Sequence, residues 1–232
     1  MTETTRYAIY FAPPQDSPLW RFGSAVLGYD AATGEAVPHR PLAGVAADEW
    51  PALSAEPRVY GFHATLKAPF RLAAGMSAAD LHEAVEDLSR RQHAVILDGL
   101  AVAVLGRFVA LTPVGDVAAL EALALRATSE LDVLRAPLNE AEMQKRLKAP
   151  LTERQRASLE RFGYPYVGED FRFHMTLSGG LPAERVAPVA DALRKAHAAD
   201  VPPGRVAVDS LAVFEQAAPG ANFRITGRFA LR

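Results

Sequence analysis

The 232-residue chain contains no cysteine, and this absence excludes disulfides, thiolate nucleophiles and cysteine-based zinc sites. No uncharged apolar run reaches the roughly 18 residues that suggest a membrane-spanning helix. Residues 1–6 also lack the basic start and apolar stretch of a signal peptide. We therefore expect a cytoplasmic protein with no membrane partner. The oligomeric state does not follow from the sequence.

A strong charge of either sign is missing too. The formal net charge is −2, whereas domains that bind long nucleic acid are usually strongly basic. Binding of long nucleic acid is therefore not expected, although a local basic pocket is compatible with this charge. Half of the residues are hydrophobic and 22% are charged, which is typical of a globular protein with a sizeable core.

Several well-known catalytic motifs are absent. The chain has no glycine-rich phosphate loop, no dinucleotide-binding fingerprint and no Gly-x-Ser-x-Gly elbow.

One short motif is present twice. Phe-His-Ala-Thr-Leu occupies residues 62–66, and Phe-His-Met-Thr-Leu occupies residues 173–177. Residues i and i+2 of a β-strand share one face. Each predicted strand therefore has one apolar face and one face that carries an imidazole and a hydroxyl.

The elements around the two motifs follow the same order. Each motif strand is followed by an amphipathic helix and then by two strands. The expected elements are a strand at 6–12, a first histidine strand at 59–72, a helix from 77, strands at 94–105 and 107–112, a helical insert within 116–163, a second histidine strand at 171–178, a helix from 182, and strands at 206–214 and 223–231.

This order indicates an internal duplication, with copies 174 − 63 = 111 positions apart. We predict an α+β fold of two similar lobes, whose antiparallel-rich sheets flank a central cleft with helices outside. The first lobe would be residues 1–115. The helical insert and second lobe would be residues 116–232, and both would form one compact bilobal domain.

The segment 13–57 is rich in proline, glycine and small residues, and we expect a long connection there. It is either a lid or cleft wall, or an ordinary surface excursion. Trp20, Phe22 and Trp50 are expected to pin it to the body of the protein.

Two facing histidines can act as an acid–base pair. The ordinary histidine pKa is near 6.5, so His63 and His174 can hold opposite protonation states near neutral pH. One ring would accept a proton while the other donates one to a leaving oxygen. Thr65 and Thr176 would hold the oxygens of a tetrahedral group between the rings. Which histidine is the base stays open.

The paired H-x-T motifs, with their flanking residues, resemble the 2H phosphoesterase superfamily. The strings 60–70, 162–166 and 171–177 are similar to a bacterial branch described as a phosphonate-metabolism protein. The resemblance covers nearly the whole chain. It implies metal-independent opening or formation of a cyclic phosphodiester, with the two histidines as the catalytic pair and the two threonines on the phosphate.

The substrate that the resemblance implies is a small phosphorylated molecule. It is a nucleoside 2′,3′-cyclic phosphate or, given the phosphonate link, a cyclic sugar phosphate such as phosphoribosyl 1,2-cyclic phosphate. No cofactor and no metal are expected, because neither motif has further ligands at metal-binding spacing.

Six more residues are candidates for substrate binding, two of them weaker. Strand alternation places Lys67 on the face of His63, and Arg172, with a weaker Ser178, on the face of His174. Tyr60 and Tyr166, like Tyr164, would line the cleft and stack on a base or sugar. The alternatives are strand-end cations that reach solvent and aromatic residues that pack in the core or at its rim.

Other functions remain open at this point. A non-catalytic binder of nucleotides or RNA ends would use the same cleft, and RNA end-ligation would use the same residues. The remaining histidines favour structural or surface roles: His39, His82, His93 and His197.

Overall fold

The computed structural model describes residues 5–232. Part of the segment on which the signal-peptide prediction rests, residues 1–4, lies outside this range. No helix within the described range is both long and apolar enough to cross a membrane.

The main sheet has seven strands in the order β11-β10-β1-β4-β8-β7-β6, and every neighbouring pair is antiparallel. Its strands are β1 (Arg6–Phe11), β4 (Ala64–Phe70), β6 (Gly99–Leu105), β7 (Phe108–Val114), β8 (Met175–Thr176), β10 (Ser210–Gln216) and β11 (Arg224–Ala230). Strands β4 and β8 are joined at one residue pair, Ala64 with Met175. The prediction of an α+β fold with antiparallel sheets is confirmed.

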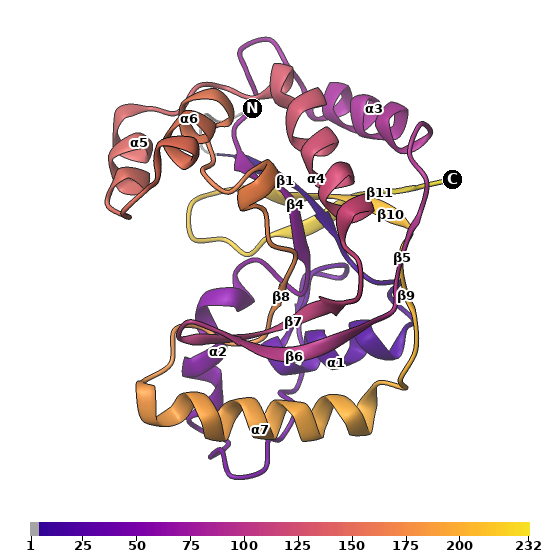
Figure 1. Ribbon diagram of the computed structural model, residues 1–232, viewed down its shortest axis with the longest axis vertical. Helices are drawn as coiled ribbons and strands as arrows, with labels where there is room; N and C mark the ends of the chain where they lie inside the picture. Colours follow the sequence, from indigo (N-terminus) through magenta and orange to yellow (C-terminus); the bar gives the residue numbers. More distant parts are fainter. Residues whose placement is uncertain (1–4) are drawn as a thin grey trace.

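Helices cover the two ends of this sheet (Figure 1). In the upper lobe, α3 packs on β10 and β11, and α4 packs on β4; in the lower lobe, α7 packs on β6 and β7. The helices are α1 (Pro18–Leu27), α2 (Trp50–Arg58), α3 (Ala78–Ser89), α4 (Ala118–Glu130), α5 (Glu140–Leu147), α6 (Glu153–Phe162) and α7 (Ala183–Asp200), with 3₁₀ turns η1 (Asp132–Leu134) and η2 (Gly168–Asp170).

The repeated order of elements is present in the structure. Strand β4 is followed by α3, β5 (Val95–Leu97), β6 and β7, and β8 is followed by α7, β9 (Val206–Val208), β10 and β11. Equivalent strands pair with each other, β4 with β8 and β5 with β9. However, each β-hairpin lies in the other copy's lobe: β7 pairs with β8, and β10 pairs with β1, which in turn pairs with β4. The sheet is therefore not divided at residue 115.

Capping boxes begin the helices at the expected places. Ser77 accepts a hydrogen bond from the backbone of Asp80, whose carboxylate accepts one from the Ser77 backbone, and α3 then buries Leu81, Val85 and Leu88. Helix α6 begins with the same reciprocal bonds and ends at Gly163, which has a left-handed φ of 68°.

The expectation of one long connection over 13–57 is wrong. The segment forms α1, α2 and a small hairpin of β2 (Tyr29–Asp30) and β3 (Glu35–Ala36). Ser17 caps α1, and proline stands in the first turn of both helices, where its missing N–H costs nothing. Trp20, Phe22 and Trp50 are buried, as expected.

The second histidine strand is shorter than expected, because β8 contains only Met175–Thr176 rather than residues 171–178. The sequence interpretation also missed α5 within the insert. Its N-terminal capping box, Asn139 with Glu142, is visible in the sequence.

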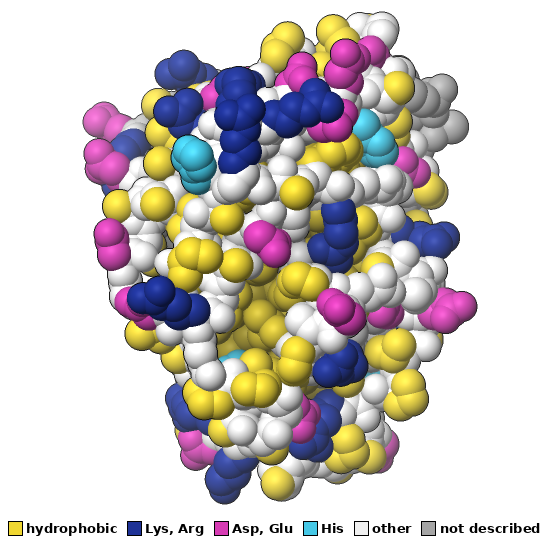
Figure 2. Space-filling model, turned by 90° about the vertical axis from the view of Figure 1, so that its right-hand side faces the viewer, with side chains coloured by type: hydrophobic (Ala, Val, Ile, Leu, Met, Phe, Trp, Pro, Cys, Tyr) yellow, Lys and Arg dark blue, Asp and Glu magenta, His cyan; other side chains and the backbone are white. Residues whose placement is uncertain are grey.

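The molecular face in Figure 2, turned by 90° from Figure 1, mixes acidic and basic side chains, with hydrophobic side chains around a central hollow. Acidic and basic side chains thus alternate over this face, and they form no continuous basic surface on it.

Candidate active site

A cleft of about 580 Å³ lies where β4 meets β8, and both histidine motifs line it. The four motif side chains on this one cavity are His63, Thr65, His174 and Thr176. A smaller cavity of about 210 Å³ adjoins it and includes His63, Thr176, Tyr60 and Phe108 in its lining. The structure therefore brings together the two imidazoles and hydroxyls that lie more than a hundred residues apart in sequence.

The two imidazoles are held in the same way. The Nδ1 atom of His63 lies 2.8 Å from the carbonyl oxygen of Gly61, and the Nδ1 atom of His174 lies 2.8 Å from that of Arg172. Because a carbonyl oxygen only accepts, each Nδ1 carries a proton and donates. A neutral ring then has its lone pair on Nε2. Each ring therefore presents a potential base to the cleft.

His63 lies in an apolar setting. Its ring stacks on Tyr10 with 3.8 Å between centroids. Burial lowers the pKa of His63 to about 4; nearby His174 acts in the same direction, and the Gly61 carbonyl opposes both. His63 is therefore neutral at pH 7.

Two glycines position the backbone before His63. Gly61 has φ 71°, and a Cβ atom there would lie 2.6 Å from the Ala31 side chain. A Cβ atom on Gly23 of α1 would lie 2.1 Å from the Phe62 ring. Helix α1, in the segment expected to be a loop, thus packs directly behind the first histidine motif.

The threonines lie beside the rings. The hydroxyl of Thr65 is 3.4 Å from Nε2 of His63, which is long for a hydrogen bond. Thr65 and Thr176 are both half-buried on the cleft wall. A phosphate between the histidines would meet a hydroxyl from each strand.

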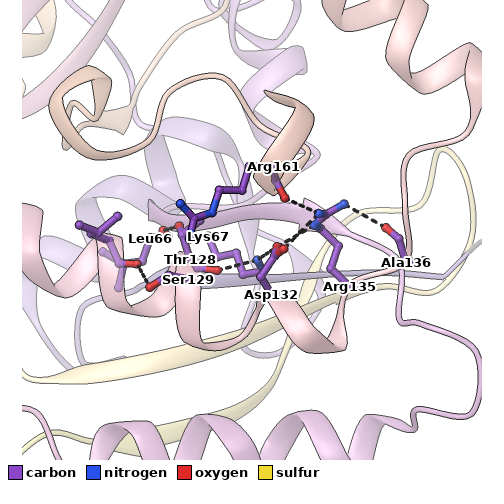
Figure 3. A network of polar contacts seen from close by, with 9 residues as sticks. Leu66, Lys67, Thr128, Ser129, Asp132, Arg135, Ala136 and Arg161 are labelled. Carbon is purple, nitrogen blue, oxygen red and sulfur yellow. Dashed lines mark hydrogen bonds and ion pairs between the residues drawn. The ribbon is translucent and has the colours of Figure 1, made fainter. Parts of the chain in front are cut away.

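Lys67 lines the cleft, as expected, but its ammonium group already has partners. The side chain donates to the Thr128 carbonyl and to Asp132, both at 3.0 Å, and the residue is only 2% exposed. Arg135 donates to the same carboxylate and also to the Arg161 carbonyl, as Figure 3 shows. The structure thus gives Lys67 a place in an internal network that joins β4 to η1 and α6.

Burial is the largest influence on both sides of this ion pair. It lowers the pKa of Lys67, and the Asp132 carboxylate only partly offsets it. It would raise the pKa of Asp132, but hydrogen bonds from Arg135 and Lys67 outweigh it and keep that pKa below its usual range.

Of the other candidate residues, the tyrosines line the cleft and Arg172 does not. Tyr60 and Tyr166 line the cleft, as does Tyr164, whose ring meets that of Tyr166 edge to face at 5.5 Å. Arg172 does not line it, because its guanidinium donates to the backbone carbonyls of Glu169 and Phe171. Strand alternation does not apply to Arg172, since β8 begins only at Met175.

Ser178 has a structural position. Its buried hydroxyl accepts from the Val109 backbone and donates to the Gly179 carbonyl, both at 3.0 Å.

The sequence interpretation missed several residues of the cleft. Tyr10 and Arg6 come from β1, Arg71 directly follows β4, and Arg146 belongs to α5 of the insert. The capping box at Asn139 would have predicted α5 and its basic face. Nothing in the sequence alone places β1 next to the first histidine strand.

No group of three or more histidine, aspartate or glutamate side chains is arranged to hold a metal ion within residues 5–232. The expectations about metal and cofactor remain predictions.

Residues 65–224 match the family model described as "Protein of unknown function (DUF1045)", and the chain belongs to this family. It is 40% identical over 222 residues to the ribose 1,5-bisphosphate phosphokinase PhnN of Janthinobacterium sp. (strain Marseille), an alignment that covers 94% of this chain and 49% of the relative. A protein of the same name from Laribacter hongkongensis (strain HLHK9) is 38% identical over 224 residues, with 95% and 50% covered. The chain thus spans about half the length of these curated relatives.

Among solved structures, E. coli LigT complexed with 3′-AMP is 18% identical, with a TM-score of 0.44 and 99% of each chain covered. TT0787 of Thermus thermophilus is 17% identical, with a TM-score of 0.46 and 98% of each chain covered. These are remote similarities and say nothing of the activity of this chain.

Proposed function

We propose that this chain is a phosphoesterase that opens a cyclic phosphodiester by two-histidine acid–base catalysis without a metal ion. The observation that carries the proposal is the matched pair of imidazoles, each held through Nδ1, on one cleft with two threonine hydroxyls.

The lowered pKa of His63 favours this residue as the base. Neutral His63 takes a proton from water, and the water oxygen bonds to phosphorus. The bond from phosphorus to one ring oxygen breaks, and protonated His174 donates a proton to that oxygen. The products are a phosphate monoester and a free hydroxyl. Thr65 and Thr176 donate to the remaining phosphate oxygens.

The kinase activity in the relatives' names belongs, in this proposal, to the half that this chain does not cover. The sequence has no Gly-x-x-x-x-Gly-Lys-Ser/Thr phosphate loop, which supports this division.

The name of these relatives also suggests a substrate. Opening ribose 1,2-cyclic phosphate 5-phosphate at the bond from phosphorus to O2 leaves ribose 1,5-bisphosphate, the compound in that name. A reaction that phosphorylates this product would then follow directly.

The test is a screen of nucleoside and sugar cyclic phosphates, followed by phosphorus NMR with and without EDTA. We expect a cyclic phosphate signal to convert to a monoester signal in both conditions, and the conversion to be at least about 100-fold slower with the H63A and H174A variants. Conversion that stops with EDTA and returns with zinc or manganese would overturn the metal-free mechanism. Tight nucleotide binding without turnover would support a non-catalytic binder instead.

A further inference from the structure

The part of the cleft beside the helical insert carries an excess of positive charge. Glu142 is the one carboxylate in its lining within the described residues. The cationic side chains there are Arg6, Lys67, Arg71, Arg135, Lys145 and Arg146.

Half of these cations already have carboxylate partners. Lys67 and Arg135 share Asp132, and Arg71 pairs with Glu142. By contrast, within residues 5–232 neither Arg6 nor Arg146 has a carboxylate oxygen within 4.0 Å. These two guanidinium groups come from β1 and α5, and both line the same cleft.

Aromatic rings and a hydrogen bond hold both guanidinium groups in place. The Arg146 guanidinium lies 5.5 Å from the centre of the Tyr164 ring. The Arg6 guanidinium lies 5.6 Å from the Phe223 ring, and its Nε donates to Gln216 at 2.8 Å. Burial lowers the pKa of Arg146; the positive charge of Arg6 acts in the same direction, whereas Tyr164 and Glu142 oppose both. Two neighbouring, partly buried cations repel each other, and a bound anion would offset this repulsion.

Two phenols complete the cluster. Burial raises the pKa of Tyr164 to about 12, so its hydroxyl stays a hydrogen-bond donor at neutral pH. Tyr60 lies beside His63, with 6.2 Å between ring centroids. The cluster therefore adjoins the histidine pair within one cavity.

We propose that Arg6, Arg146, Tyr60 and Tyr164 form a second anion subsite, which binds a phosphate monoester elsewhere on the substrate. Guanidinium groups suit this ligand because their fork of N–H donors matches two phosphate oxygens. The inference rests on the proposed function, in which the cyclic phosphodiester lies between the histidines. It makes the enzyme selective for cyclic sugar phosphates that carry an additional terminal phosphate.

The test compares ribose 1,2-cyclic phosphate with and without a 5-phosphate as substrates of the wild type and the R146A variant. We expect R146A to lower kcat/KM by about 10- to 100-fold for the doubly phosphorylated substrate, mainly through KM. R146A should change turnover of the substrate without the 5-phosphate far less, and R146K should recover part of the loss. The control is R156A, which removes an exposed arginine of the same insert outside the cleft.

A binding measurement separates failure of the subsite from failure of the proposed reaction. Ribose 5-phosphate, titrated by calorimetry, should bind the wild type and R156A equally and R146A at least about 10-fold more weakly. Equal binding to wild type and R146A overturns the subsite, whatever the turnover assay gives. If R146A does not fold, as judged by thermal unfolding, Tyr164→Phe replaces it, with an expected loss of about 2- to 10-fold.

Discussion

The two histidine half-sites keep the same polar atoms and differ in what surrounds them. In each, Nδ1 meets a carbonyl two residues back, and a threonine follows two residues on. The ring of His63 stacks on Tyr10, whereas the ring of His174 is tilted against that of Phe108, with 5.8 Å between centroids. The reactive groups are thus repeated, and their environments are not.

The same contrast holds four residues after each histidine. Lys67 joins a buried ionic network in the first copy, and Ser178 makes two neutral hydrogen bonds in the second. A pair of acid and base needs unequal proton affinities. Different supporting residues around a repeated pair of imidazoles are one way to obtain them.

The largest expected effect comes from removing either imidazole. H63A and H174A should each lower kcat by about 10²–10⁴-fold, because each proton transfer contributes that much. The double variant should lose little more than the worse single variant, since both rings serve one reaction. Steady-state kinetics on an opened cyclic phosphate measures this, and full activity in either single variant would break the comparison.

The polar contacts around Lys67 and around Ser178 should contribute differently to the free energy of unfolding. Asp132→Asn leaves the buried ammonium of Lys67 without a full counter-charge, and we expect a loss of about 2–3 kcal/mol in the free energy of unfolding. This is below the range for fully buried pairs because the Asp132 side chain is 22% exposed. Ser178→Ala should cost about 1–2 kcal/mol, since it leaves the Val109 N–H unpaired. Urea denaturation of both variants checks the order.

The threonines should matter less than the imidazoles. Thr65→Val and Thr176→Val remove a hydroxyl at nearly constant shape, and each should lower kcat/KM by roughly 10-fold through a lost donor to the phosphate. A much larger loss at one position than at the other would show that the two strands hold the phosphate unequally.

The smallest effect concerns pH. His63 acts as a base only when neutral, so the acid limb of kcat/KM should lie near its lowered pKa of about 4 rather than near 6.5. Tyr10→Leu removes the ring that stacks on His63 and should move the acid limb to higher pH. Tyr10→Phe keeps a stacked ring and should leave the acid limb where it is.

The stability of the folded state also depends on the lowered pKa of His63. The unfolded chain takes up the proton first, because its histidine pKa is higher. The contribution of His63 to stability is therefore complete above about pH 6.5 and is lost as the pH falls toward 4.

Much of this molecule follows from local sequence patterns. The repeated motif, the capping boxes at Ser77 and Thr152 and the helical periodicities predict the elements that build the cleft and place four side chains on it. These features depend on neighbours in the chain, which a single sequence displays.

The parts that escaped prediction depend on contacts between distant segments. Arg172 does not line the cleft, because its segment is not a regular strand. Lys67 pairs with Asp132, which lies 65 residues further along the chain. The helix α1 was hidden by the prolines and glycines around it, although Ser17 and Pro18 mark its start. The crossing of the hairpins between lobes has no local signal at all.

The single pairing of Ala64 with Met175 has a mechanical consequence. Each of these residues directly follows a histidine. The seam between the lobes, which is this one pair, therefore also sets the distance between the two imidazole rings. A slight rotation of one lobe at this seam would widen or narrow the gap across the reacting phosphorus, and a ligand that touches both lobes would set that gap.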